Sequence, residues 1–354
     1  MKKFLSILLV LTMVLALAAC GGSSTAETEA PKAEAPAATE APAAEAPAAE
    51  EAGSIVVGFA QVGHESDWRT ANTKNYQDVF SAENGYDLIF VDCDNDNAVQ
   101  IESVRTSIQQ GVDYIILAPI QSAGWESVLQ EAKDAGIPVI VADRQVDADA
   151  SMYDAFIGTD TEVEGKLAGD WLAEYLNGAE ANILVIEGSI GASAAIGRTN
   201  GFNSVAEQHD EWTILDSQSG DFTQTGGQEV MESYIKSYNG QFNVVVCQND
   251  NEAYGAMDAM DAAGITYGVG GDVIIISFDA THDGLQYTLD GKIHCNVECN
   301  PIQAEYVDTI IKQMEAGEDF ATYTLVEDSA FVAPGIESQY ATTMTQEVLD
   351  GRAY

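Results

Sequence analysis

The stretch Ile137-Pro138-Val139-Ile140-Val141-Ala142-Asp143-Arg144 decides the fold. Its apolar, β-branched run has the composition of a strand buried on both faces, which is typical of a parallel sheet covered by helices. An acid and a base follow the run directly. Open α/β sheets bind their ligands beyond the carboxyl ends of their strands, so Asp143 and Arg144 are expected either to clamp a ligand or to form a surface ion pair.

Apolar runs of this kind alternate with segments of helical period along the chain from about residue 54. We expect strands at 55–60, 87–91, 114–118, 137–142 and 155–158, and then again at 182–187, 213–216, 244–247, 273–278 and 293–299. We expect helices near 68–82, 97–110, 124–135, 161–176, 194–208, 224–237 and 251–263. Two successive halves predict an α/β fold of two doubly wound, parallel-sheet lobes with a ligand crevice between them.

Polar and aromatic side chains follow these strands at the same end. Carboxylates accept hydrogen bonds from neighbouring hydroxyls and guanidinium groups donate to sugar oxygens, so this set suits a neutral polyol. Each residue alone has an ordinary alternative, such as a helix cap for Asn249 or packing within its own domain for Trp68. The candidate ligand-binding residues are Trp68, Arg69, Asp143, Arg144, Ser193, Arg198, Phe222, Asn249, Asp279, Glu298 and Asn300.

The placement of arginine supports a binding site. The chain has five arginines, and Arg69, Arg144 and Arg198 all fall at strand exits. Arg105 lies within a predicted helix and Arg352 in the tail, where contact with solvent is sufficient. Forked donors that are scarce in so acidic a chain and that gather at one crevice indicate a binding role.

Other chemistries find little support. The glycine-rich turn at 187–198 lacks the Gly-Lys-Ser/Thr of a phosphate-binding loop, and no nucleophile–base pair or metal-ligand set is present, so we expect no enzyme activity, no cofactor and no metal. Cys295 and Cys299, beside His294, would lie about 13 Å apart along one strand, too far for one zinc ion. We therefore expect buried free thiols.

The amino-terminal region predicts export. Residues 1–19 have the basic start and short apolar core of a signal peptide, and Leu17-Ala18-Ala19-Cys20 resembles a bacterial lipobox with Cys20 as the lipidated residue. Residues 20–53, rich in Ala, Glu and Pro, read as a disordered tether. The net charge of −43 argues against nucleic acid and against electrostatic attachment to anionic lipid. We expect the protein on the outer face of the cytoplasmic membrane, held there only by its lipid anchor.

From about residue 54 the chain resembles the type I solute-binding proteins of bacterial sugar ABC importers, the ribose-binding and repressor-like group, and within it the galactofuranose-binding members. A repressor with this core would need a basic helix-turn-helix where the export signal stands. The stretches that carry the resemblance are 57–63 with Trp68-Arg69, 111–113, 118–119, 124–126, Asp143-Arg144, 164–166, 191–193 with Arg198, 218–222 and Asn249-Asp250.

The resemblance implies the type I periplasmic-binding-protein fold with a three-segment hinge. The expected amino-terminal lobe comprises 54–157 plus 300–322, and the carboxyl-terminal lobe 158–299 plus 323–354. Asp143 and Arg144 match the sugar-hydroxyl pair, Arg198 the donor from the second lobe, Asn249 and Asp279 its amide and carboxylate, and Trp68 and Phe222 its aromatic walls. The last-strand contact stays open between Glu298, Cys299 and Asn300.

The resemblance also implies a role. The chain is expected to act as a monomer that binds a monosaccharide, with a galactofuranose-like furanose favoured, and delivers it to an ABC permease. The alternative is a receptor of the same fold that senses ribose, arabinose, galactose or a signalling sugar.

Overall fold

The computed structural model describes residues 53–354. The predicted signal peptide, the lipidated Cys20 and the tether up to residue 52 lie outside the described residues. Within 53–354, no helix combines the length and apolar character needed to cross a membrane.

The first lobe is built on a parallel sheet with the strand order β11-β5-β4-β3-β1-β2. Its central strands carry the continuous apolar runs that the sequence showed, because helices cover both faces. The strands are β1 (Ile55–Gln61), β2 (Tyr86–Asp92), β3 (Tyr114–Leu117), β4 (Val139–Asp143), β5 (Ala155–Gly158) and β11 (Tyr323–Leu325).

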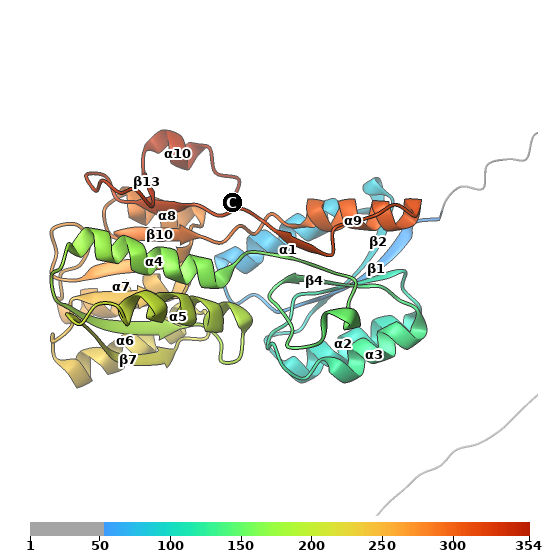
Figure 1. Ribbon diagram of the computed structural model, residues 1–354, viewed down its shortest axis with the longest axis horizontal. Helices are drawn as coiled ribbons and strands as arrows, with labels where there is room; N and C mark the ends of the chain where they lie inside the picture. Colours follow the sequence, from blue (N-terminus) through green and yellow to red (C-terminus); the bar gives the residue numbers. More distant parts are fainter. Residues whose placement is uncertain (1–52) are drawn as a thin grey trace, which may run out of the picture. The chain divides into compact units, whose positions relative to one another are not determined.

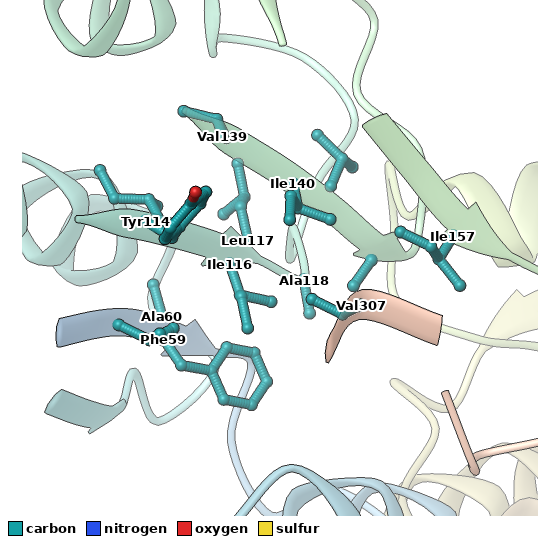
Figure 2. Packing of buried hydrophobic residues seen from close by; sticks show 14 of the residues in the cluster. Phe59, Ala60, Tyr114, Ile116, Leu117, Ala118, Val139, Ile140, Ile157 and Val307 are labelled. Atoms are coloured by element: carbon teal, nitrogen blue, oxygen red, sulfur yellow. The ribbon is translucent and has the colours of Figure 1, made fainter. Parts of the chain in front are cut away.

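Four helices belong to the first lobe: α1 (Asp67–Val79), α2 (Asn97–Gln110), α3 (Glu126–Ala135) and α9 (Ala304–Ala316). α1 packs against α9 and α2 against α3, and Figure 1 shows the two pairs on opposite sides of the strands. Figure 2 shows the core between them, where Val307 of α9 meets Ile116 and Ile140 of the sheet. This packing keeps the strand ends rigid, which a site built on them requires.

The second lobe has a sheet with the order β13-β12-β10-β9-β8-β6-β7. All its strand pairs are parallel except β10 with β12, so β12 and β13 run opposite to the other strands. The strands are β6 (Ala181–Glu187), β7 (Trp212–Ser219), β8 (Val244–Cys247), β9 (Ile274–Asp279), β10 (Cys295–Glu298), β12 (Ala330–Val332) and β13 (Thr342–Thr343).

Helices cover both faces of the second sheet as well. They are α4 (Thr161–Leu176), α5 (Ser193–Ala206), α6 (Gln224–Tyr238), α7 (Asp250–Ala263), α8 (His282–Leu289) and α10 (Gln346–Asp350). Along β6, Ile183 and Val185 join the core formed with α4 and α5, whereas Leu184 and Ile186 join the core formed with α6 and α7. This alternation shows why the strand is apolar at each position from Ile183 to Ile186.

The chain passes between the two sheets three times, after β5, after β10 and after β11. The predicted α/β fold of two doubly wound lobes is confirmed. The boundary expected at 322 is wrong by one strand, because β11 hydrogen-bonds to β5 and Val326 belongs to the core of the first lobe. The three residues of this exposed edge strand were too few to show a strand pattern.

Large aromatic and sulfur side chains fill the cores. Trp125, Trp171 and Trp212 are buried in the cores of the two lobes. The cysteines of the described region, Cys93, Cys247, Cys295 and Cys299, are all buried and free.

His294 makes a buried contact that predicts pH-dependent stability. Its Nδ1 accepts a hydrogen bond from Ile275 N (3.2 Å) and its side chain is almost fully buried. Burial lowers the pKa of His294 from 6.5 to about 4. Below pH 6.5, His294 is therefore protonated in the unfolded chain but stays neutral in the folded protein. The free energy of unfolding falls as the pH falls toward 4.

We expect His294 to contribute a loss of about 2–3 kcal/mol in the free energy of unfolding between pH 7 and pH 4.5. In His294→Asn, an amide oxygen can replace Nδ1 as the acceptor but does not titrate, so the variant should lack this part of the loss. Urea unfolding of both proteins at the two pH values measures the difference. Equal losses in the two proteins would show that other groups cause the pH dependence.

Candidate ligand-binding site between the lobes

A cavity lies where strand exits of the two sheets face each other. It brings together eight of the eleven predicted site residues: Trp68, Arg69, Asp143, Arg144, Arg198, Phe222, Asn249 and Asp279. It is also lined by Glu65, Ser66, Ala194 and Cys299, which the sequence analysis had not assigned to ligand binding. Cys299 had been named there only as an open alternative for the last-strand contact.

The first-lobe half of the site is organised by Arg69. Its Nη2 donates to Asp143 Oδ2 at 2.7 Å and its Nε to Glu65 Oε1 at 3.0 Å. Its Nη1 donates to Gln61 and Asn72. Arg69 is fully buried, and a buried guanidinium of this kind is stable only when its donors are satisfied.

Asp143 and Arg144 are not hydrogen-bonded to each other, and neither is a surface residue. The Arg144 Nε to Asp143 Oδ2 distance is 3.9 Å, longer than a hydrogen bond, whereas Asp143 pairs tightly with Arg69. The backbone explains the change. Asp143 has a left-handed φ of 64°, and Arg144 N donates to Ala142 O at 2.7 Å, so a tight turn around Asp143 separates the two side chains.

Arg144 instead faces Glu65 and the second lobe. Its Nη2 lies 3.3 Å from Glu65 Oε1, and its guanidinium lies 5.0 Å from the centre of the Phe222 ring. Burial and the nearby charge of Arg69 lower the pKa of Arg144. Burial alone would raise the pKa of Glu65, but the charges of Arg69 and Arg144 outweigh it and lower that pKa.

Two polar atoms of this pair remain unused. Within residues 53–354, neither Arg144 Nη1 nor Glu65 Oε2 has a hydrogen-bond partner, although both atoms are buried. Buried polar atoms in native proteins are nearly always paired, and leaving one unpaired costs about 1–3 kcal/mol. A donor and an acceptor beside one cavity are thus available to a ligand that carries hydroxyl groups.

The second-lobe half is organised by Arg198 on α5. Its Nε donates to Glu164 Oε2 at 2.7 Å, its Nη1 to the carbonyl of Gln248, and its Nη2 to Asp279 Oδ1 at 3.3 Å. Burial raises the pKa of Asp279 to about 8, against the opposing charge of Arg198. Asp279 also has a left-handed φ of 96°. Such backbone conformations gather at functional sites, where the surrounding structure holds them in place.

Trp68 joins the first lobe to a crossing segment. Its Nε1 donates to Cys299 O at 2.6 Å, and the Arg69 guanidinium lies 4.6 Å from the ring centre. The side chain is buried yet lines the cavity. Trp68 therefore combines the two roles that the sequence left open, packing and a wall of the site.

Three predicted site residues lie elsewhere. Glu298 accepts hydrogen bonds from Ser329 N, Arg352 and Tyr354, so its carboxylate binds the chain's last residues instead of facing the cavity. Arg352 is consequently not a solvated tail residue. Asn300 caps the segment that follows it, with Oδ1 accepting from Ile302 N. Of the three candidates from the last strand, only Cys299 lines the cavity.

Ser193, the third of these residues, takes part in a set of hydrogen bonds between the lobes. Ser193 Oγ accepts from Gln145 N at 2.8 Å, and Gly191 O accepts from Ser122 N at 2.9 Å. Elsewhere, Asp67 N donates to Asn251 Oδ1 at 3.0 Å, and Asn251 Nδ2 donates to Asp67 Oδ2 at 3.2 Å. These bonds hold the lobes together without using the groups that face the cavity.

Each arginine that lines the cavity is paired with an acid: Arg69 with Asp143, Arg144 with Glu65, and Arg198 with Glu164. A neutral ligand leaves these pairs intact, whereas an anionic ligand would have to displace a carboxylate from an arginine. In the part of the chain that the structure describes, no group of three or more His, Cys, Asp or Glu side chains is arranged to hold a metal ion.

Comparison with known proteins agrees with this geometry. The family described as "Periplasmic binding protein domain" matches residues 57–316. The galactofuranose-binding protein YtfQ of Escherichia coli K12 is 41% identical over 256 residues, which are 72% of this chain and 80% of that protein.

Two solved structures extend the comparison. A Mycobacterium smegmatis protein in complex with β-D-fucofuranose is 43% identical, with a TM-score of 0.76 over 79% of this chain and 91% of that one. The binding component of the arabinose ABC transporter of Shewanella sp. ANA-3, bound to α- and β-L-arabinofuranose, is 37% identical, with a TM-score of 0.74 over 78% and 91% of the two chains. The chain therefore belongs to the periplasmic binding protein family and has the type I fold.

Proposed function

We propose that this protein is the extracytoplasmic sugar-binding component of an ABC importer. A monosaccharide binds in the cavity between the lobes, and the closed protein delivers it to a membrane permease. The protein binds its ligand without converting it and acts as a monomer.

The observation that carries this proposal is a pair of buried atoms at the cavity, Arg144 Nη1 and Glu65 Oε2, that have no hydrogen-bond partner within residues 53–354. A sugar hydroxyl can accept from the first and donate to the second at once. Because each arginine of the lining is already paired with an acid, the cavity favours a neutral polyol over a sugar phosphate. Trp68 and Phe222 add aromatic surface for the C–H faces of a sugar ring.

A furanose is the favoured ligand class. The three relatives described above are named for, or bound to, galactofuranose, fucofuranose and arabinofuranose. The location follows from the amino-terminal sequence, with Cys20 lipidated after removal of residues 1–19 and the tether joining the anchor to the binding lobes. Mass spectrometry of the mature amino terminus tests the anchor, and an unmodified Cys20 would contradict it.

A titration with a sugar panel tests the proposed function. Purified protein is titrated by calorimetry and by tryptophan fluorescence with D-galactose, L-arabinose, D-ribose and their methyl furanosides and methyl pyranosides. We expect at least one furanose to bind more tightly than its pyranose counterpart and to change the fluorescence, because Trp68 lines the cavity. If no member of the panel binds, the proposal fails.

Arg144→Ala should weaken sugar binding by about 2–4 kcal/mol, because it removes the free donor and leaves Glu65 without one of its cationic partners. Arg105→Ala is the matched control, since Arg105 pairs with Glu131 on the surface of the first lobe. The control should bind like the wild type. A folded Arg144→Ala protein with wild-type affinity would exclude Arg144 as a ligand contact.

A growth test distinguishes import, which requires delivery of the sugar to a permease, from sensing. A deletion strain should fail to grow on the sugar that the titration identifies. Normal growth on that sugar would favour the sensing alternative.

A further inference from the structure

The segment that carries Phe222 has an unusual backbone. Asp221 and Phe222 are consecutive residues with left-handed φ angles of 57° and 60°. Residues with a Cβ atom rarely adopt this region, and a bulky side chain there needs an external cause. The segment follows β7 at the exit where the cavity lies.

The cause is the start of α7, which holds the Phe222 main chain at both polar groups. Glu252 Oε1 accepts from Phe222 N at 2.9 Å, and Asn249 Nδ2 donates to Phe222 O at 2.9 Å. Asn249 and Glu252 are also hydrogen-bonded to each other, because Asn249 Oδ1 accepts from Glu252 N at 2.8 Å. The side chain of Asn249, predicted to bind sugar, is thus engaged by the protein while the residue still lines the cavity.

These two hydrogen bonds to the Phe222 main chain set the position of its ring. The ring packs so closely on Gly188 that a Cβ there would lie 1.9 Å from ring atom Cζ, and its other neighbours include Ala192, Ala194 and Ala195. Its centre lies 5.0 Å from the Arg144 guanidinium of the opposite lobe. A small change of the main chain at Phe222 would therefore move the ring relative to Arg144.

Glu252 is not placed there for stability alone. It is completely buried, and its Oε2 has no hydrogen-bond partner among the described residues. Gly220 leaves room for the carboxyl, since a Cβ at this glycine would lie 3.0 Å from Glu252 Oε1. A buried acid that satisfies one backbone N–H and leaves its other oxygen unpaired has a position that packing does not explain.

We propose that Glu252 is a positioning residue that fixes Phe222 as an aromatic wall of the cavity and so sets sugar affinity without touching the sugar. The inference rests on the proposed function of the cavity.

The surroundings of Glu252 shift its pKa. Burial raises the pKa of Glu252 well above its usual value, with the charge of Asp279 acting in the same direction, whereas the hydrogen bond from Phe222 N and the charge of Arg198 oppose it. Asp250 and the Cys247 thiol lie in the same environment.

Glu252→Ala and Glu252→Gln are tested by calorimetric titration with methyl β-D-galactofuranoside and with L-arabinose. Glu252→Ala leaves Phe222 N unpaired and should weaken binding by roughly tenfold to a hundredfold. Glu252→Gln keeps a neutral acceptor and should restore the affinity to within about threefold of the wild type at pH 7.

A double-mutant cycle separates positioning from a general loss of structure. If Glu252 acts through the ring, Glu252→Ala should weaken binding no further in a Phe222→Ala background. Asp258→Asn, an exposed acid on the same helix, should bind like the wild type.

The possible failures are distinguishable. If the wild type binds no member of the sugar panel, which includes both of these sugars, the proposed function fails. If it binds and Glu252→Ala binds equally well, or if the two substitutions weaken binding independently, only the role of Glu252 is overturned.

Discussion

The buried ion pair between Arg69 and Asp143 is the contact on which the first-lobe half of the site depends. It links the first turn of α1 to the end of β4, residues 74 positions apart in the chain. Because burying a guanidinium is unfavourable unless its donors are used, the pair requires Glu65, Gln61 and Asn72 as further partners. Arg69 thereby pairs with the Asp143 carboxylate, and Arg144 keeps its Nη1 as a donor without a partner within residues 53–354. The cation adjacent to Asp143 in sequence is thus the one left available for a ligand.

The positions of the site residues could be predicted from the sequence, but their partners could not. Strand exits are readable because an apolar run ends there, and eight of the predicted residues meet at one cavity. Pairing depends on side-chain direction and on contacts between distant segments. The tight turn at Asp143, which separates its side chain from that of Arg144, left no mark in the sequence pattern. Glu65 and Glu252 were missed for the same reason, since each acts on a residue of another element.

The last strand shows a second limit of sequence patterns. Its polar residues Glu298 and Asn300 were natural candidates, yet each is used by the chain that follows it: Glu298 by Arg352 and Tyr354, Asn300 by Ile302. The tail had no apolar pattern that would place it against β10. The buried Cys299, whose thiol behaves as a small apolar side chain, lines the cavity instead. The short strands β11 to β13 were missed because each has only two or three residues.

The hydrogen bonds between the lobes, Asp67 with Asn251 and Ser193 with Gln145, have a thermodynamic consequence of their own. They exist only while the lobes are together, so they stabilise the closed form whatever the ligand. The apparent dissociation constant of a two-state receptor is its intrinsic constant divided by the fraction of competent protein. Substitutions at these positions would rescale the affinity for every ligand by one common factor and leave selectivity unchanged. Sensitivity and selectivity can therefore evolve at separate residues in this molecule.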